Sequence, residues 1–142
     1  MARKQGELKG NMLIAQSGGP TAVINQSLAG AVLEAKKHDC IERIYGALHG
    51  IQGILDEDFI NLKRESEKNL MRIANTPSSA LGSVRKKPDS SDCAKMFEVM
   101  QKYGVRYFFY IGGNDSAETA HIINEEAKKK DYELHCYHIC KT

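Results

Sequence analysis

Residues 106–119 read RYFFYIGGNDSAET, and this stretch decides the fold. The first six residues are mostly aromatic or branched and run directly into Gly112 and Gly113, which predicts a buried strand ending in a tight turn. Beyond the turn, apolar residues recur at helical spacing over residues 117–130, and residues 114–116 supply side chains able to cap the helix. A strand, a glycine turn and a helix N-terminus in this order favour the binding of an anion, usually phosphate.

A second unit of the same kind opens the chain. Residues 11–16 (NMLIAQ) predict a strand, and SGGPT follows before a helix over about residues 21–37. The alternative is that Gly18 and Gly19 only permit a sharp turn and close helix packing. Two such turns in one chain favour the phosphate-binding interpretation.

Composition limits the class of protein. The chain has 142 residues, of which 42% are hydrophobic and 27% charged, so we expect one domain or part of one. Its net charge of +2 gives no field that would attract nucleic acid or an anionic membrane. No run of spanning length and no signal-like stretch is visible, so we expect a cytoplasmic protein.

The remaining patterns complete an alternating order of strands and helices. Residues 56–67 are charged and weakly patterned, and we expect them to be peripheral. The other predicted elements are strands at 41–48 and 134–139, a short helix or turn after residue 48, a short helix at 69–75, and a helix from Ser91 or Asp92 to Tyr103, closed by Gly104. This order predicts an α/β fold, a parallel sheet with helices on both faces.

In such sheets ligands bind beyond the carboxyl ends of the strands, where both glycine turns and Lys141 fall. Residues 78–91 (SSALGSVRKKPDSS) form a loop in which Arg85 is a candidate phosphate contact, the alternative being a solvated basic loop. The cysteines show no C-x-x-C spacing and are interpreted as reduced, partly buried residues: Cys40, Cys93, Cys136 and Cys140.

Four motifs carry a resemblance that covers residues 11–142. SGGPTAVIN at 17–25, GSVR at 82–85, IGGNDS at 111–116 and HICKT at 138–142 resemble the 6-phosphofructokinase family. The resemblance implies the Rossmann-like N-terminal part of the phosphofructokinase fold. It also implies a glycolytic reaction, the transfer of a phosphoryl group to the 1-hydroxyl of fructose 6-phosphate with Mg²⁺.

The resemblance also bears on the phosphate donor. Relatives that use ATP usually carry Gly-Gly-Asp-Gly-Ser, whereas those that use pyrophosphate carry Asp in place of the fourth residue and Lys in a Pro-Lys-Thr run. Asp115 and Lys141 match the second pattern. The carboxylate of Asp115 would repel a phosphate beyond the two of pyrophosphate, and Lys141 adds a positive charge beside the remaining phosphates. Pyrophosphate is therefore favoured over ATP.

Site roles follow from the resemblance position by position. Asp115 and Lys141 are the expected catalytic residues, and Asn114 stands where many relatives have a magnesium-binding Asp, which is a departure. The alternative for Asp115 is a capping box with Glu118. The residues expected to bind the donor phosphate are Gly18, Gly19, Arg85, Gly113 and Ser116.

Further departures concern the end of the chain. Cys140 replaces the proline of the Pro-Lys-Thr run, and the Ile-Asp-Asn-Asp run that holds the catalytic base in relatives is not within residues 1–142. We therefore expect a polar tail (1–10) and an incomplete donor-phosphate-binding α/β domain (11–142) that is inactive alone and exposes apolar side chains such as Phe108, Ile111 and Ile139. Alternatives are an ATP-dependent enzyme or a non-catalytic phosphate-binding fragment. The expected partners are pyrophosphate and fructose 6-phosphate, and the full-length protein is expected to be a homo-oligomer.

Overall fold

The predicted buried strand is β4 (Val105–Gly112) in the computed structural model, which describes residues 8–17, 22–64, 66–74 and 89–140. β4 pairs in parallel with β1 (Gly10–Gln16) on one side and with β5 (His135–Cys140) on the other. A strand that has a neighbouring strand on each side and helices on both faces of the sheet is apolar along its whole length, as residues 107–111 are. The strand prediction is therefore confirmed.

The sheet has five strands in the order β3-β2-β1-β4-β5. β2 (Ile41–Ala47) runs parallel to β1, whereas the edge strand β3 (Phe59–Asn61) runs antiparallel to β2. The sheet is thus mostly parallel, and the predicted α/β fold class is confirmed. β3 lies in the stretch expected to be peripheral and was missed, because an edge strand of three residues is too short to show an alternation of apolar and polar residues.

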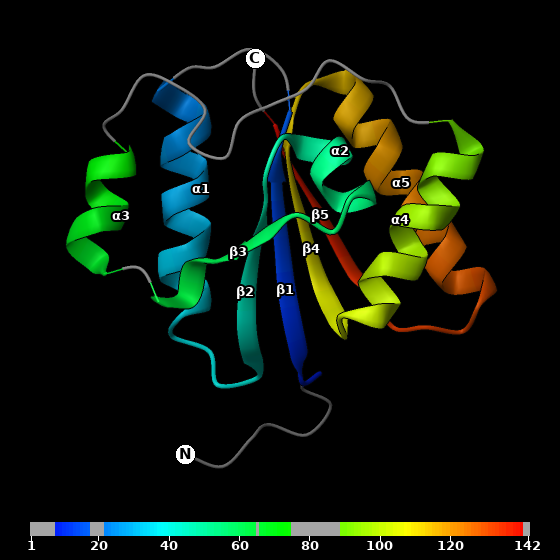
Figure 1. The fold of residues 1–142 in the computed structure, drawn as a ribbon, viewed down its shortest axis with the longest axis horizontal. Coiled ribbons are helices and arrows are strands. Elements are labelled where there is room, and N and C mark those ends of the chain that lie inside the picture. The colour runs from blue at the N-terminus through cyan, green and yellow to red at the C-terminus, as the bar shows by residue number, and fades with distance from the viewer. Residues whose placement is uncertain (1–7, 18–21, 65, 75–88, 141–142) are drawn as a thin grey trace.

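Helices cover both faces of the sheet (Figure 1). One face carries α1 and α3, and the other carries α2, α4 and α5. A short 3₁₀ helix, η1 (Leu62–Arg64), follows β3. The helix bounds are α1 (Ala22–Ala35), α2 (Gly50–Leu55), α3 (Glu67–Ala74), α4 (Ser90–Lys102) and α5 (Asn114–Lys129).

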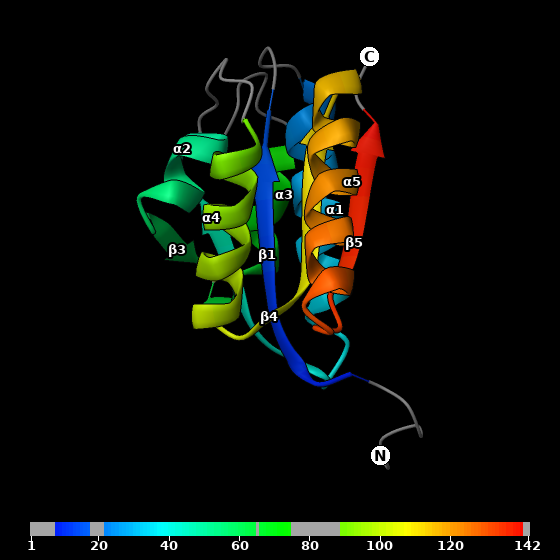
Figure 2. The same cartoon turned by 90° about the vertical axis from the view of Figure 1, so that its right-hand side faces the viewer.

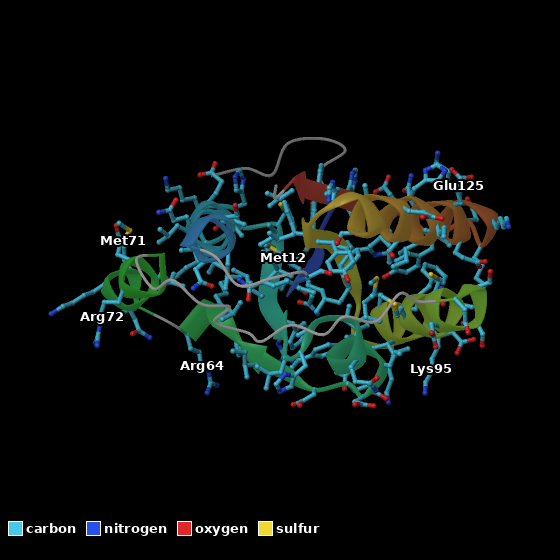
Figure 3. All side chains as sticks on the ribbon, turned by 90° about the horizontal axis from the view of Figure 1, so that it is seen from above. Met12, Arg64, Met71, Arg72, Lys95 and Glu125 are labelled. Carbon is cyan, nitrogen blue, oxygen red and sulfur yellow. The ribbon has the colours of Figure 1, made fainter. Side chains whose placement is uncertain are left out.

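Two apolar cores follow from the alternation of side chains along β1 and β4. Leu13 and Phe108 are fully buried beneath α4 and α5, whereas Met12 and Ile14 are fully buried beneath α1. Viewed from above, Met12 lies inside the structure while Arg72 on α3 and Lys95 on α4 extend outward (Figure 3). Each fully buried side chain of this size contributes about 1.5–3 kcal/mol, so β1 is held from both sides.

The ends of α4 differ in part from the prediction. Asp89, rather than Ser91 or Asp92, is the N-cap: its carboxylate accepts the backbone N–H of Asp92 at 2.8 Å, and the Asp92 carboxylate accepts that of Asp89 at 3.2 Å. This reciprocal arrangement is a capping box. Gly104 closes the helix with φ of +64°, as predicted.

Of the three apolar side chains expected to be exposed, Ile139 is partly exposed, whereas Phe108 and Ile111 are buried. Phe108 and Ile111 are 0% exposed, because helices cover β4 on both faces. The exposed aromatic residue is Tyr137, which stacks on Phe109 with ring centroids 4.9 Å apart. These two rings line a groove of about 530 Å³ between α1 and the β4–β5 side of the sheet, toward the amino ends of the strands.

No helix in the described part of the chain is both long enough and apolar enough to span a membrane.

Candidate functional site at the carboxyl edge of the sheet

The strands that precede the two predicted glycine turns, β1 and β4, are neighbours in the sheet. The backbone N–H of Ser17, directly after β1, donates to the carbonyl of Ile111 in β4 at 2.8 Å. The register pairs Gln16 with Ile111, so both strands end at the same level. The arrows of β1 and β5 point to the edge at which α5 begins (Figure 2). Ser17 and Gly112 therefore come together, as expected for a parallel sheet.

Helix α5 begins without a side-chain cap. Gly113 is its N-cap, with φ of −88° and ψ of −153°, and its carbonyl accepts the N–H groups of Ser116 and Ala117 at 3.1 and 3.3 Å. The prediction that residues 114–116 cap the helix is wrong, because they form its first turn, and the capping box of Asp115 with Glu118 fails for the same reason. The positive end of the α5 dipole and uncapped N–H groups therefore face this edge.

Gly112 is required for space, not for backbone conformation. A Cβ at this position would lie 2.2 Å from Oγ of Ser116 and 3.1 Å from Cβ of Ser17. No positive φ is found at Gly112 or Gly113. The glycine thus lets the first turn of α5 and the end of β1 pack directly against β4.

A buried phenol lies beneath this packing. Tyr110 is 1% exposed, and its hydroxyl forms hydrogen bonds with the side chains of Ser17 and Ser116. Burial raises the pKa of Tyr110, and the two serine hydroxyls partly offset that rise. Ser116, expected to bind phosphate, is itself 3% exposed, so its hydroxyl belongs to this network beneath the edge.

A second polar link joins β1 to α1. The side-chain amide of Gln16 donates to the side-chain carbonyl of Asn25 at 3.2 Å, and both residues are fully buried. A buried hydrogen bond of this kind fixes the relative position of two elements, because breaking it leaves unsatisfied polar groups. Both residues were missed as structural parts of the site, although polar residues amid apolar runs are a detectable signal.

His138 links β5 to the same turn. Its Nε2 lies 2.9 Å from the carbonyl oxygen of Gly112, and its side chain is half-buried. The contact joins residues 26 positions apart, which no local pattern can reveal.

Several predicted residues lie outside the described part of the chain, namely Gly18, Gly19, Arg85 and Lys141. Asn114 and Asp115 occupy the first two positions of α5, which places their backbone at the edge. Within the described ranges, no group of three or more His, Cys, Asp or Glu residues could hold a metal ion.

The described cysteines show no metal-binding or redox arrangement. Cys40 and Cys93 are buried with free thiols, and Cys136 is a half-buried free thiol whose pKa burial raises to about 12. A thiol with so high a pKa is unreactive near neutral pH. The partial or complete burial of these three cysteines is as expected.

Comparison with known proteins matches residues 11–142 to the family described as Phosphofructokinase. The pyrophosphate--fructose 6-phosphate 1-phosphotransferase of Rhodospirillum rubrum is 56% identical over 94% of this chain and 33% of its own length. The enzyme of the same name from Xanthomonas campestris is 41% identical over 94% of this chain and 32% of its own length. The chain therefore spans about a third of the curated relatives it matches.

Solved structures agree with this assignment. The crystal structure of the pyrophosphate-dependent phosphofructokinase from Marinobacter aquaeolei is 38% identical, with a TM-score of 0.88 over 94% of this chain and 33% of that protein. The phosphofructokinase of Pichia pastoris, at 20% identity and a TM-score of 0.70 over 85% of this chain and 12% of that protein, shares the fold. Sequence and fold thus match the same family, and the chain belongs to the phosphofructokinases.

Proposed function

We propose that this chain forms the donor-phosphate side of a pyrophosphate-dependent 6-phosphofructokinase, which transfers a phosphoryl group from pyrophosphate to the 1-hydroxyl of fructose 6-phosphate. The observation that carries the proposal is the position of Asp115, the second residue of α5, at the edge where the helix dipole favours an anion. Relatives whose names specify pyrophosphate, at 56% and 41% identity, support the same donor.

Backbone groups would hold the donor. The uncapped first turn of α5 offers N–H groups after Gly113, and the adjacent end of β1 leads into Gly18 and Gly19. Backbone N–H groups around an anion stabilise it without side-chain reorganisation. Phosphoryl transfer is catalysed chiefly by positioning and by electrostatic stabilisation of this kind. In this proposal Ser116 acts by fixing the turn through its buried hydroxyl, and Arg85 contacts the donor from its loop.

Donor choice would depend on charge at the same edge. Asp115 places a carboxylate at the second position of α5, where it disfavours a further phosphate and the nucleotide attached to it. Lys141, directly after β5, would neutralise the shorter donor. Both residues act through the phosphates, so we assign them catalytic roles within the proposal.

Magnesium is part of the proposed reaction. Amide and carboxylate oxygens, of the kinds that Asn114 and Asp115 carry, are the hard ligands that Mg²⁺ prefers, and these are the first two residues of α5. Bound there, the ion would offset charge on the transferring phosphoryl group. The full-length protein is further proposed to be a cytoplasmic homo-oligomer.

The test is a chimera in which this chain replaces the matching third of the Rhodospirillum rubrum relative. Purified chimera is assayed with fructose 6-phosphate and Mg²⁺, with either pyrophosphate or ATP as donor, beside the unmodified relative. We expect turnover with pyrophosphate and none above background with ATP. Equal or greater turnover with ATP would refute the assignment of the donor, and binding of either donor without turnover would favour a phosphate-binding role.

A further inference from the structure

The turn between β4 and α5 contains a peptide bond whose two residues are both glycine. Gly112 precedes the bond and Gly113 follows it, and neither carries a side chain that would restrict rotation of the peptide plane. On one side, Gly112 is held in register with Cys140 of β5, and on the other, the carbonyl of Gly113 accepts two N–H groups of α5. A further hydrogen-bond partner would restrict the plane between these anchors.

His138 supplies that partner. It lies opposite Tyr110 in the parallel ladder, two residues before Gly112, and its Nε2 reaches along the sheet to the Gly112 carbonyl at 2.9 Å. A carbonyl oxygen accepts hydrogen bonds and cannot donate them, so Nε2 is the protonated nitrogen in this contact. The imidazole therefore donates to Gly112.

The orientation of the carbonyl determines that of the next N–H. The described chain has no cis peptide bond, and in a planar trans peptide the C=O and N–H bonds point in opposite directions. With the Gly112 carbonyl directed at His138, the N–H of Gly113 points away from it. This N–H belongs to the N-cap of α5, the first residue of the uncapped end that faces the proposed donor.

We propose that His138 is a positioning residue, which fixes the Gly112–Gly113 peptide so that the N–H of Gly113 is directed at the pyrophosphate donor. The inference rests on the proposed function, because it concerns the same edge. His138 itself does not contact the donor in this account. It acts through the peptide plane, and its loss removes one restraint on that plane.

Two variants of His138 separate the effect of its hydrogen-bond donor from the effect of its side-chain volume. His138→Gln retains an N–H donor at the end of a side chain of similar reach, whereas His138→Leu fills similar space without a donor. His135→Leu is the control: His135 lies on the same strand but is exposed and stacks on Tyr107 with ring centroids 5.5 Å apart. All three are made in the chimera, and the KM for pyrophosphate, the KM for fructose 6-phosphate, kcat and the melting temperature are measured.

We expect His138→Leu to raise the KM for pyrophosphate about ten- to hundredfold. The reason is that the charge-assisted hydrogen bond from the Gly113 N–H to the pyrophosphate would be weakened. The KM for fructose 6-phosphate should stay within about twofold, and His138→Gln and His135→Leu should remain near the parent. Equal losses for the Gln and Leu variants, or an equal rise in both KM values, would overturn the inference. If the parent chimera used ATP in place of pyrophosphate, the proposed function would fail, while the KM for ATP in the same variants would still decide the role of His138.

Discussion

The substitution Gly112→Ala tests whether close packing at the turn sets the geometry of the site. The added Cβ would lie 2.2 Å from Oγ and 3.0 Å from Cβ of Ser116, and 3.1 Å from Cβ of Ser17, whereas ordinary contacts begin at 3.4 Å. Rotation of the Ser116 hydroxyl would relieve the shortest contact at the expense of its hydrogen bond with Tyr110, about 1 kcal/mol. The two Cβ contacts would remain and push β4 away from α5 and β1.

Overpacking of this kind costs about 1–3 kcal/mol, so the total loss in the free energy of unfolding is about 2–4 kcal/mol. Gly30→Ala is the matched control, since nothing lies within 4 Å of its added Cβ and the residue is exposed in the interior of α1. In a helix interior that change should stabilise by about 0.5–1 kcal/mol. The two variants should therefore shift stability in opposite directions.

Urea unfolding of the chimera measures both free energies, and the KM for pyrophosphate is measured in parallel. Adding Ser116→Ala to Gly112→Ala should recover part of the stability, because the atom nearest to the new Cβ is removed. The reasoning would be refuted if Gly112→Ala were as stable as Gly30→Ala, or if removal of the Ser116 hydroxyl gave no recovery.

Four other predictions concern Asp115, Asp89 and Cys136. Asp115→Gly in the chimera should lower turnover with pyrophosphate and let ATP compete, because a carboxylate is removed from the first turn of α5; an unchanged donor preference in paired assays would exclude this role. Asp89→Ala should reduce the free energy of unfolding by about 1 kcal/mol through loss of the capping box of α4, with no change in the KM for pyrophosphate, and a change in KM without a change in stability would contradict it. Alkylation of Cys136 at pH 8, followed by peptide mass spectrometry, should be roughly a thousandfold slower in native protein than in urea, because burial raises its pKa from 9.0 to about 12. Since the folded pKa is the higher one, stability should fall as pH rises from about 9 to about 12, and Cys136→Ala should flatten that fall; equal pH profiles for the two proteins would contradict the burial argument.

Local sequence patterns were enough to predict the two strand–turn–helix units. The run at residues 107–111 is apolar on both faces because helices cover β4 on both sides, and helical spacing marked α5 after it. Gly104 was predicted correctly as the end of α4 because a left-handed residue after a helix strongly favours glycine. The order of these elements was enough to predict an α/β sheet with both glycine turns at one edge.

The tertiary structure decided the features that depend on partners distant in sequence. β3 has three residues and no period, so only its pairing with β2 defines it. Gly113 became the N-cap because the chain leaves the sheet there, although the residues that follow have better capping side chains. The hydrogen bonds of Tyr110 with Ser17 and of His138 with Gly112 join separate strands, and they arise only when the sheet brings those strands into register.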